Sequence, residues 1–318
     1  GSDARGGVFR ERTFGWVETL ARLRGSDLDP GPWLEWGTSG LKSSIRRRLG
    51  LPVGRIGRKE DFLYNFANSG AGCDDLMTGP LRQAPWLRDL MDKEPKRWKD
   101  GIVVIRIGLA NWIPLLSLQA ENPNAPEVTQ VIERCTARFE QTIALLREHH
   151  PGLRFLIMGI GNEIDDPGQF KYFQSARETR NIRQALDRYN GAVRAVAERT
   201  PGAAYFDTDA WFQRLWGARA EDGLPNAYRS VTVGDFVVTN TAGDEPHNAL
   251  IADLHSGTVW NALLVQAMVL RLREAFGLSL APVTDEELWR YLRPLVRPEA
   301  AQPGKPAEPP QSVRAPGS

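Results

Sequence analysis

Apolar residues recur at three- and four-residue steps through the middle of the chain, and this spacing predicts a long helix. The recurring positions are Val128, Val131, Ile132, Cys135, Phe139, Ile143 and Leu146. They form one apolar stripe on a helical surface. We expect the helix to end near residues 150–152, because Pro and Gly stop a helix. Similar patterns predict helices over residues 13–23, 180–198 and 257–276.

Short apolar runs alternate with these helical segments. Residues 102–107 read Ile-Val-Val-Ile-Arg-Ile after a Lys-Asp-Gly turn, and such a β-branched run predicts a buried central strand. Further strands are expected over residues 62–67, 153–160 and 203–207. Strands that alternate with helices predict an α/β fold with a mostly parallel central sheet and helices on both faces.

The chain of 318 residues is expected to form one domain over residues 1–298. Residues 26–60 are rich in Gly, Pro, Ser and Arg and predict a long irregular excursion. Within it, Trp33 and Trp36 could line a sugar or lipid site, although core packing explains them equally well. Residues 299–318 contain many Pro, Gly, Ala and Ser and predict a disordered tail.

Composition narrows the classes of function. Forty basic and 39 acidic residues leave a net charge of +1, which gives no reason to expect nucleic acid or an anionic membrane as the main partner. No apolar stretch is long enough to predict a membrane span, and the sequence assigns no compartment. Two cysteines, Cys73 and Cys135, exclude a disulfide scaffold and a cysteine-based zinc site. Whether these two form one disulfide is left open.

In an open α/β sheet, ligands bind beyond the carboxyl ends of the strands, so the loops after the strands are the places for chemistry. Residues 69–72, Ser-Gly-Ala-Gly, are expected to open a helix whose free N–H groups, including that of Gly70, stabilise an oxyanion. An ordinary turn is the alternative. After the central strand, the amide of Asn111 could donate to the same oxyanion or cap a helix.

The loop after the following strand contains Gly159-Ile160-Gly161, which lacks the third Gly of a dinucleotide-binding fingerprint. Glu163, Asp165 and Asp166 could hold a hard cation, but we favour a solvated acidic loop.

The most specific pattern is Asp253-Leu254-His255, immediately before the helix predicted over residues 257–276. An Asp two residues before a His in a loop can place its carboxylate beside Nδ1, which orients a His general base. Of the other histidines, His149 and His150 end a helix and are expected to interact with its C-terminus, and His247 lies in a polar loop without an assigned role.

These motifs in this order resemble the SGNH (GDSL-type) hydrolases, esterases and lipases of flavodoxin-like, three-layer α/β fold. The likeness runs from about Gly15 to Phe276, and residues 14–20 are similar to the helix that follows the nucleophile loop in that family. The resemblance implies cleavage of a small-molecule or glycan ester by Ser-His-Asp acyl transfer, without a cofactor or metal. It implies His255 as the general base, Asp253 as its orienting acid, and Gly70 and Asn111 as oxyanion donors.

The chain departs from the family at two places. The nucleophile normally lies in a Gly-Asp-Ser-Leu stretch at the end of a strand, whereas residues 1–3 read Gly-Ser-Asp. Either the nucleophile precedes residue 1, or Ser2 is the nucleophile in a degenerate motif. In the family's Gly-x-Asn-Asp loop, Ala110 stands where the Asn would fall and Asn111 follows it.

Two alternatives follow from these departures. One is a non-catalytic protein of the same fold that binds a glycan or ester. The other is an enzyme with Cys73 as nucleophile at a helix N-terminus, although a small buried residue explains that cysteine better.

Overall fold

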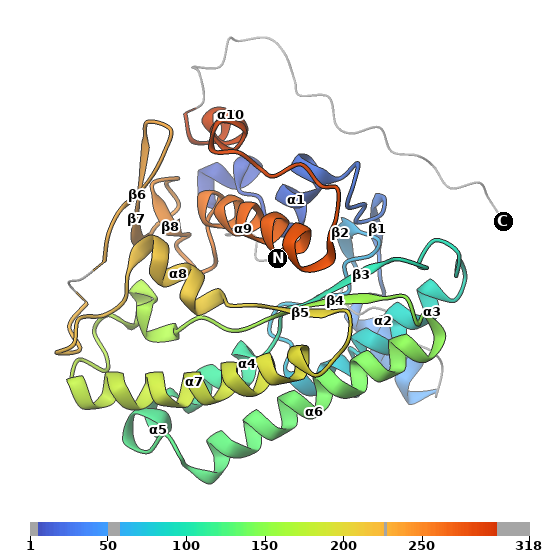
Figure 1. Ribbon diagram of the computed structural model, residues 1–318, viewed down its shortest axis with the longest axis horizontal. Helices are drawn as coiled ribbons and strands as arrows, with labels where there is room; N and C mark the ends of the chain where they lie inside the picture. The colour runs from blue at the N-terminus through green and yellow to red at the C-terminus, as the bar shows by residue number, and fades with distance from the viewer. Residues whose placement is uncertain (1–5, 50–57, 226–227, 298–318) are drawn as a thin grey trace.

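The computed structural model describes residues 6–49, 58–225 and 228–297, and it has an α/β fold (Figure 1). Three parallel strands form the central sheet in the order β3-β4-β5: β3 (Ile102–Ile105), β4 (Arg154–Met158) and β5 (Ala203–Phe206). Helices α6 (Pro126–His149) and α7 (Ala176–Glu198) cover one face. Helices α1 (Trp16–Arg24) and α9 (Thr258–Phe276) cover the other.

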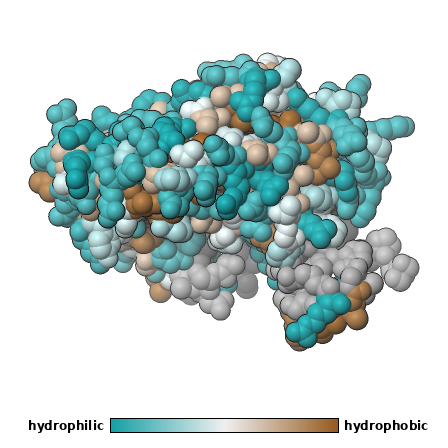
Figure 2. Space-filling model, turned by 90° about the horizontal axis from the view of Figure 1, so that it is seen from below, coloured by the Kyte–Doolittle hydropathy of each residue, from teal (hydrophilic) through white to brown (hydrophobic). Residues whose placement is uncertain are grey.

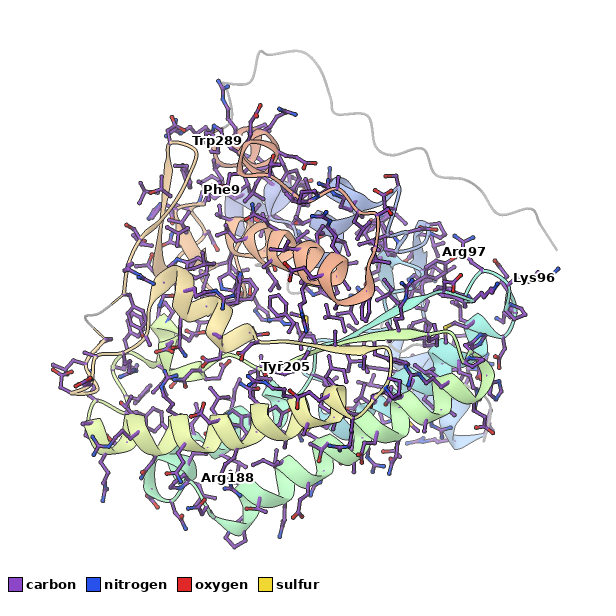
Figure 3. The ribbon with its side chains drawn as sticks, in the orientation of Figure 1. Phe9, Lys96, Arg97, Arg188, Tyr205 and Trp289 are labelled. Carbon is purple, nitrogen blue, oxygen red and sulfur yellow. A yellow bond between two sulfur atoms is a disulfide. The ribbon has the colours of Figure 1, made fainter. Side chains whose placement is uncertain are left out.

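The side chains of β4 explain why two hydrophobic clusters form. Successive residues of a strand point to opposite faces. Leu156 and Met158 therefore pack with α9 and α1, whereas Phe155 and Ile157 pack with α6 and α7. Tyr205 of β5 likewise points toward the α7 layer (Figure 3). The predicted arrangement of a parallel sheet with helices on both faces is confirmed.

The long helices follow the sequence signals closely. Helix α6 begins with Pro126 in its first turn and ends at His149. Helix α7 begins after Ser175, whose hydroxyl accepts from the N–H of Glu178 in a capping box. Helix α1 is followed by Gly25, as expected.

The segment 26–60 is more ordered than expected. It contains β1 (Trp33–Trp36) and α2 (Gly40–Arg48), and β2 (Lys59–Phe62) starts at its end. Strands β1 and β2 pair antiparallel as a separate two-stranded sheet. The strand predicted over residues 62–67 is wrong, because β2 ends at Phe62 and a turn follows.

Further elements surround the central sheet. Three are the strands of a mixed sheet in the order β6-β7-β8: β6 (Val231–Val233), β7 (Phe236–Ala242) and β8 (Asn248–Leu250). The others are η1 (Gly7–Arg12), η2 (Cys73–Leu76), α3 (Gln83–Met91), α4 (Leu109–Trp112), η3 (Ile113–Leu115), α5 (Leu116–Glu121), η4 (Glu163–Asp165), η5 (Pro167–Gln169), α8 (Thr208–Trp216) and α10 (Asp285–Val296).

Contrary to the prediction, residues 102–107 do not form the central strand of the sheet. Among the described strands, β3 pairs only with β4, so it lies at an edge of the sheet rather than at its centre. Ile102, Val103 and Val104 are accordingly half-buried. The β-branched composition correctly predicted a parallel strand, but it does not report how many neighbours the strand has.

Within the described ranges, no helix has the length and apolar character needed to cross a bilayer. Ser2 and the tail over residues 299–318 lie outside the residues that the structure describes.

Candidate active site

A tight loop between β8 and α9 holds Asp253 and His255. The backbone N–H of Ile251 donates to the carbonyl of His255 at 2.8 Å, and the N–H of Gly257 donates to Ala249 at 2.8 Å. Leu254 between the two site residues has a φ of 67°, a left-handed conformation that is uncommon for a residue with a side chain. This turn brings the side chains of residues 253 and 255 to the same side of the loop.

The expected contact between the two side chains is present. The Nδ1 of His255 lies 3.0 Å from the Oδ1 of Asp253, and the backbone N–H of His255 donates to the same oxygen at 3.2 Å. The His255 side chain is 65% exposed, and no described residue hydrogen-bonds its Nε2. A carboxylate on Nδ1 favours the tautomer with its lone pair on Nε2, which can accept a proton from a hydroxyl.

The Gly70 turn forms a second group of candidate residues. The N–H of Ala71 donates to the carbonyl of Asn68 at 3.3 Å, and Gly70 inside this turn has a φ of 76°. Gly70 is exposed, and no described residue accepts from its N–H. The turn leads into the four-residue 3₁₀ helix η2, not into the longer helix that was expected. The N–H of Gly70 is thus available to donate to a ligand, but the four-residue η2 does not add the dipole of a full helix.

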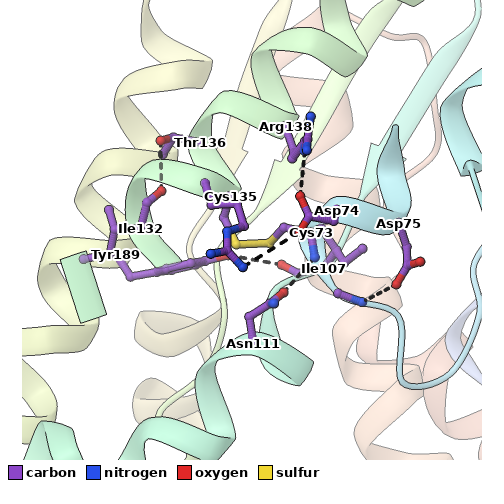
Figure 4. The surroundings of a disulfide bond; sticks show 12 residues. Cys73, Asp74, Asp75, Ile107, Asn111, Ile132, Cys135, Thr136, Arg138 and Tyr189 are labelled. Carbon is purple, nitrogen blue, oxygen red and sulfur yellow. Dashed lines mark hydrogen bonds and ion pairs between the residues drawn. A yellow bond between two sulfur atoms is a disulfide. The ribbon is translucent and has the colours of Figure 1, made fainter. Parts of the chain in front are cut away.

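Asn111 is joined to the same loop. Its Oδ1 accepts from the backbone N–H of Cys73 at 2.7 Å (Figure 4). With Oδ1 engaged, the Nδ2 group has no acceptor among the described residues, so it is free to donate. Helix α4, which carries Asn111, starts after Gly108, whose φ is 129° and whose position leaves no room for a Cβ beside the Tyr189 hydroxyl. Ala110 is exposed, and its side chain supplies no polar group.

A disulfide between Cys73 and Cys135 anchors this loop to α6 (Figure 4). The question left open by the sequence is therefore answered, and the alternative of Cys73 as a nucleophile is wrong, because no thiol is available. Asp74 adds a second anchor, since the Nε of Arg138 donates to its Oδ1 at 2.8 Å. The loop that carries Gly70 is fixed to α6 and α4 together.

The acidic residues after β4 do not form a solvated loop, contrary to expectation. The side chain of Asp165 is 2% exposed. Its Oδ1 accepts from the Tyr228 hydroxyl at 2.6 Å and from the N–H of Arg219 at 3.2 Å. Burial raises the pKa of Asp165. The described residues include no cluster of three or more His, Cys, Asp or Glu side chains that could hold a metal ion.

Glu163, expected in a solvated acidic loop, and Arg106, which the sequence analysis did not single out, interact electrostatically. Burial, and then the nearby Asp166, raise the pKa of Glu163 to about 7, while the charge of Arg106 opposes this rise. The Arg106 guanidinium lies 5.6 Å from the ring centroid of Trp260, in the first turn of α9. The sequence signal that could have identified Arg106 is its position as the one charged residue in the run 102–107, which is otherwise apolar.

The segment before α1 runs beside the His255 loop. The N–H of Phe14 donates to the Thr258 hydroxyl at 3.2 Å, and this hydroxyl donates to the carbonyl of Arg12 at 2.9 Å. Nearer its start, Gly7 lies against the carboxylate of Asp244, which accepts from the N–H of Ala252 at 3.2 Å. The side chain of Asp244 therefore links Gly7 to Ala252, the residue before Asp253.

The structure brings the candidate residues together in two groups, Asp253 with His255 and the Gly70 loop with Asn111. Among the described residues, no hydrogen bond or ion pair joins one group directly to the other. His149 and His150 contact Asp92, each with a ring nitrogen 2.9 Å from its carboxylate, instead of the end of α6. Trp36 packs edge-to-face on Phe66 with ring centroids 5.2 Å apart.

The chain matches no protein-family model and no curated protein. Its function has to be inferred from the chemistry of these two groups.

Proposed function

We propose that this chain belongs to a serine hydrolase of SGNH type that cleaves an ester of a small molecule or a glycan. The Asp253–His255 pair carries the proposal, because the Nδ1 of His255 lies 3.0 Å from the carboxylate of Asp253 and the Nε2 of His255 has no described partner. This is the arrangement that a general base for a serine hydroxyl requires.

The second group supplies donors of the kind that a developing oxyanion needs. The N–H of Gly70 and the Nδ2 of Asn111 have no described acceptor. Gly70 lies in the loop that the disulfide anchors, and Asn111 on α4 is joined to that loop through the N–H of Cys73. Donors held in place before the reaction stabilise a tetrahedral intermediate without further reorganisation.

The nucleophile is proposed to come from the segment that precedes α1. That segment packs on the start of α9, beside the His255 loop, through the bonds of Phe14 and Arg12 to Thr258. Ser2 lies four residues before Gly6, the first described residue, and is one candidate. A serine N-terminal to residue 1 in a longer chain is the other.

In the proposed reaction, the serine Oγ attacks the acyl carbon while the Nε2 of His255 takes the hydroxyl proton. The bond from the acyl carbon to the alcohol oxygen then breaks, and His255 gives the proton to the departing alcohol. A water molecule attacks the acyl-enzyme by the same route, which releases the acid and restores the serine. Asp253 stabilises the positively charged imidazole in both halves.

A second candidate function is binding of a glycan or ester without catalysis. The observation that favours it is Ala110, which supplies no amide at the position where the resemblance implies an oxyanion Asn. In that case the free groups of Gly70 and Asn111 would hold a ligand oxygen instead of a reaction intermediate.

Labelling with a fluorophosphonate probe tests the proposal, because this reagent traps a serine that has been activated by a base. We expect one labelled serine, either Ser2 or a serine upstream of it, identified by peptide mapping in the chain as given and in an N-terminally extended chain. His255→Ala should abolish the labelling. Absence of labelling in both chains, together with retained binding of an intact ester, would favour the binding protein and contradict the hydrolase.

A further inference from the structure

Helix α2 (Gly40–Arg48), with the residue that follows it, exposes a stripe of apolar side chains. Leu41, Ile45 and Leu49 are 77%, 52% and 65% exposed, and their four-residue spacing places them on one face. In Figure 2 this part of the molecule projects from the main body, with hydrophobic surface beside hydrophilic surface. The apolar stripe of α6 has the same kind of spacing but is buried in the core. The apolar stripe of α2 differs because its side chains are exposed.

The same helix is strongly basic. Residues 41–49 read Leu-Lys-Ser-Ser-Ile-Arg-Arg-Arg-Leu, with four cations and no acidic residue, whereas the whole chain has a net charge of only +1. Lys42 and Arg48 are exposed. The nearly neutral total therefore conceals a local concentration of positive charge on one short, projecting segment.

Apolar side chains flanked by lysine and arginine are what a helix presents to an anionic lipid surface. A second copy of the chain is a poor occupant, because pairing two such stripes would bring the exposed Lys42 and Arg48 of one copy toward those of the other. We propose that α2 docks the protein on an anionic lipid surface. Leu41, Ile45 and Leu49 enter the headgroup region, while Lys42 and Arg48 bind lipid phosphates.

The attachment of α2 links this surface to the Gly70 loop. The helix follows the β1 end of the small sheet, where Trp36 packs on Phe66, and Phe66 lies four residues before Gly70. Trp33 at the start of β1 is also exposed. Docking through α2 thus brings the lipid surface close to the segment that leads into the candidate site. The inference itself does not depend on any catalytic activity.

Co-sedimentation of the full chain with lipid vesicles tests the proposal. We use vesicles of phosphatidylcholine alone and vesicles that also contain phosphatidylglycerol. Binding is expected only to the anionic vesicles and should weaken as salt is added. The double variant Leu41→Gln/Ile45→Gln should lower the partition coefficient at least about tenfold. Lys42→Glu/Arg48→Glu should lower it by about fivefold or more for each charge.

Matched variants on other surfaces serve as controls. Val237→Gln/Leu270→Gln removes two exposed apolar side chains outside α2, and Lys93→Glu/Lys96→Glu reverses two exposed charges near the end of α3. Neither should change the partition coefficient appreciably. Since all substituted side chains are exposed, every variant should keep the thermal midpoint of the parent. The single variant Leu49→Gln is a further test and should also lower the partition coefficient into anionic vesicles.

Three results would overturn the proposal. The first is equal partition into both kinds of vesicle or into neither. The second is equal loss of binding in the α2 variants and in the controls. The third is self-association, measured by sedimentation velocity, that Leu41→Gln/Ile45→Gln abolishes, since this would identify a second copy as the occupant of the stripe.

Discussion

The side-chain Oδ1 of Asn111 accepts a 2.7 Å hydrogen bond from the backbone N–H of Cys73, which leaves only the amide NH₂ of Asn111 free to donate. Asn111 thus has two separable roles: its Oδ1 accepts from the loop, and its NH₂ group has no acceptor among the described residues. Two substitutions distinguish these roles.

Asn111→Asp keeps the acceptor for Cys73 and removes the donor. We expect its free energy of unfolding to stay within about 1 kcal/mol of the parent, while kcat for ester hydrolysis falls by about 10²-fold. Asn111→Ala removes both roles and should lose stability as well, by about 1–3 kcal/mol, because the N–H of Cys73 loses its partner. Urea unfolding and steady-state kinetics on both variants provide the check. Undiminished kcat in Asn111→Asp would show that the amide is not an oxyanion donor.

His255→Ala is expected to lower kcat by roughly three orders of magnitude or more in whichever chain is active. Asp253→Asn should also lower kcat, through loss of the carboxylate that orients Nδ1. Since the His255 side chain is 65% exposed, its removal should leave the thermal midpoint unchanged. Kinetics and thermal unfolding are measured on the same preparation. Normal turnover with a lowered midpoint would mean that His255 is a structural residue.

Glu163→Gln tests the pH dependence of stability. The pKa of Glu163 rises from 4.5 to about 7 in the folded protein, so the folded state holds this proton more tightly than the unfolded state does. The stability that comes from the protonated form is complete below pH 4.5 and is lost as the pH rises to about 7. Glutamine cannot lose a proton, so the variant should be the more stable protein above pH 7, by roughly 1–3 kcal/mol.

Urea unfolding of parent and variant across this pH range measures the difference. The gap between the two curves should open between pH 4.5 and 7 and then stay constant. Parallel curves over that range would show that Glu163 titrates alike in the folded and unfolded protein.

The disulfide predicts sensitivity to reductant. Cys73→Ala/Cys135→Ala should lower the free energy of unfolding by about 2–4 kcal/mol, because the bond closes a long loop in the unfolded chain. Dithiothreitol should destabilise the parent to a similar extent and leave the double variant unchanged. Denaturant midpoints with and without reductant provide the comparison. Two free thiols in the untreated parent, detected by thiol titration, would contradict the bond.

The parts of the fold that the sequence predicts well are those where local pattern and burial agree. The stripe from Val128 to Leu146 is long enough to identify α6, and Pro126 and His149 lie close to its expected limits. Strand β5, and β4 after Arg154, are continuous apolar runs with the composition that burial on both faces requires.

Other features depend on contacts between distant segments, and local pattern does not report them. Strands β6 and β8 have three residues each, too few to show a period. Asp165 is buried because Tyr228 and Arg219, more than fifty positions later, surround it. For the candidate site, the spacing of Asp253 and His255 predicted their contact, whereas the bond between Asn111 and Cys73 depends on how α4 packs against a separate loop.

Strand β3 has a consequence for how the protein behaves in concentrated solution. Its four residues, Ile102–Ile105, are all aliphatic, and no described strand pairs with its outer edge. Natural proteins usually protect such edges with lysine, proline or a bulge, because a bare edge is a template for intermolecular strand addition. The outward-facing amides of β3 should therefore exchange with deuterium faster than those of β4. Aggregation of the folded protein should therefore depend more on whether that edge is covered than on the free energy of unfolding of the domain.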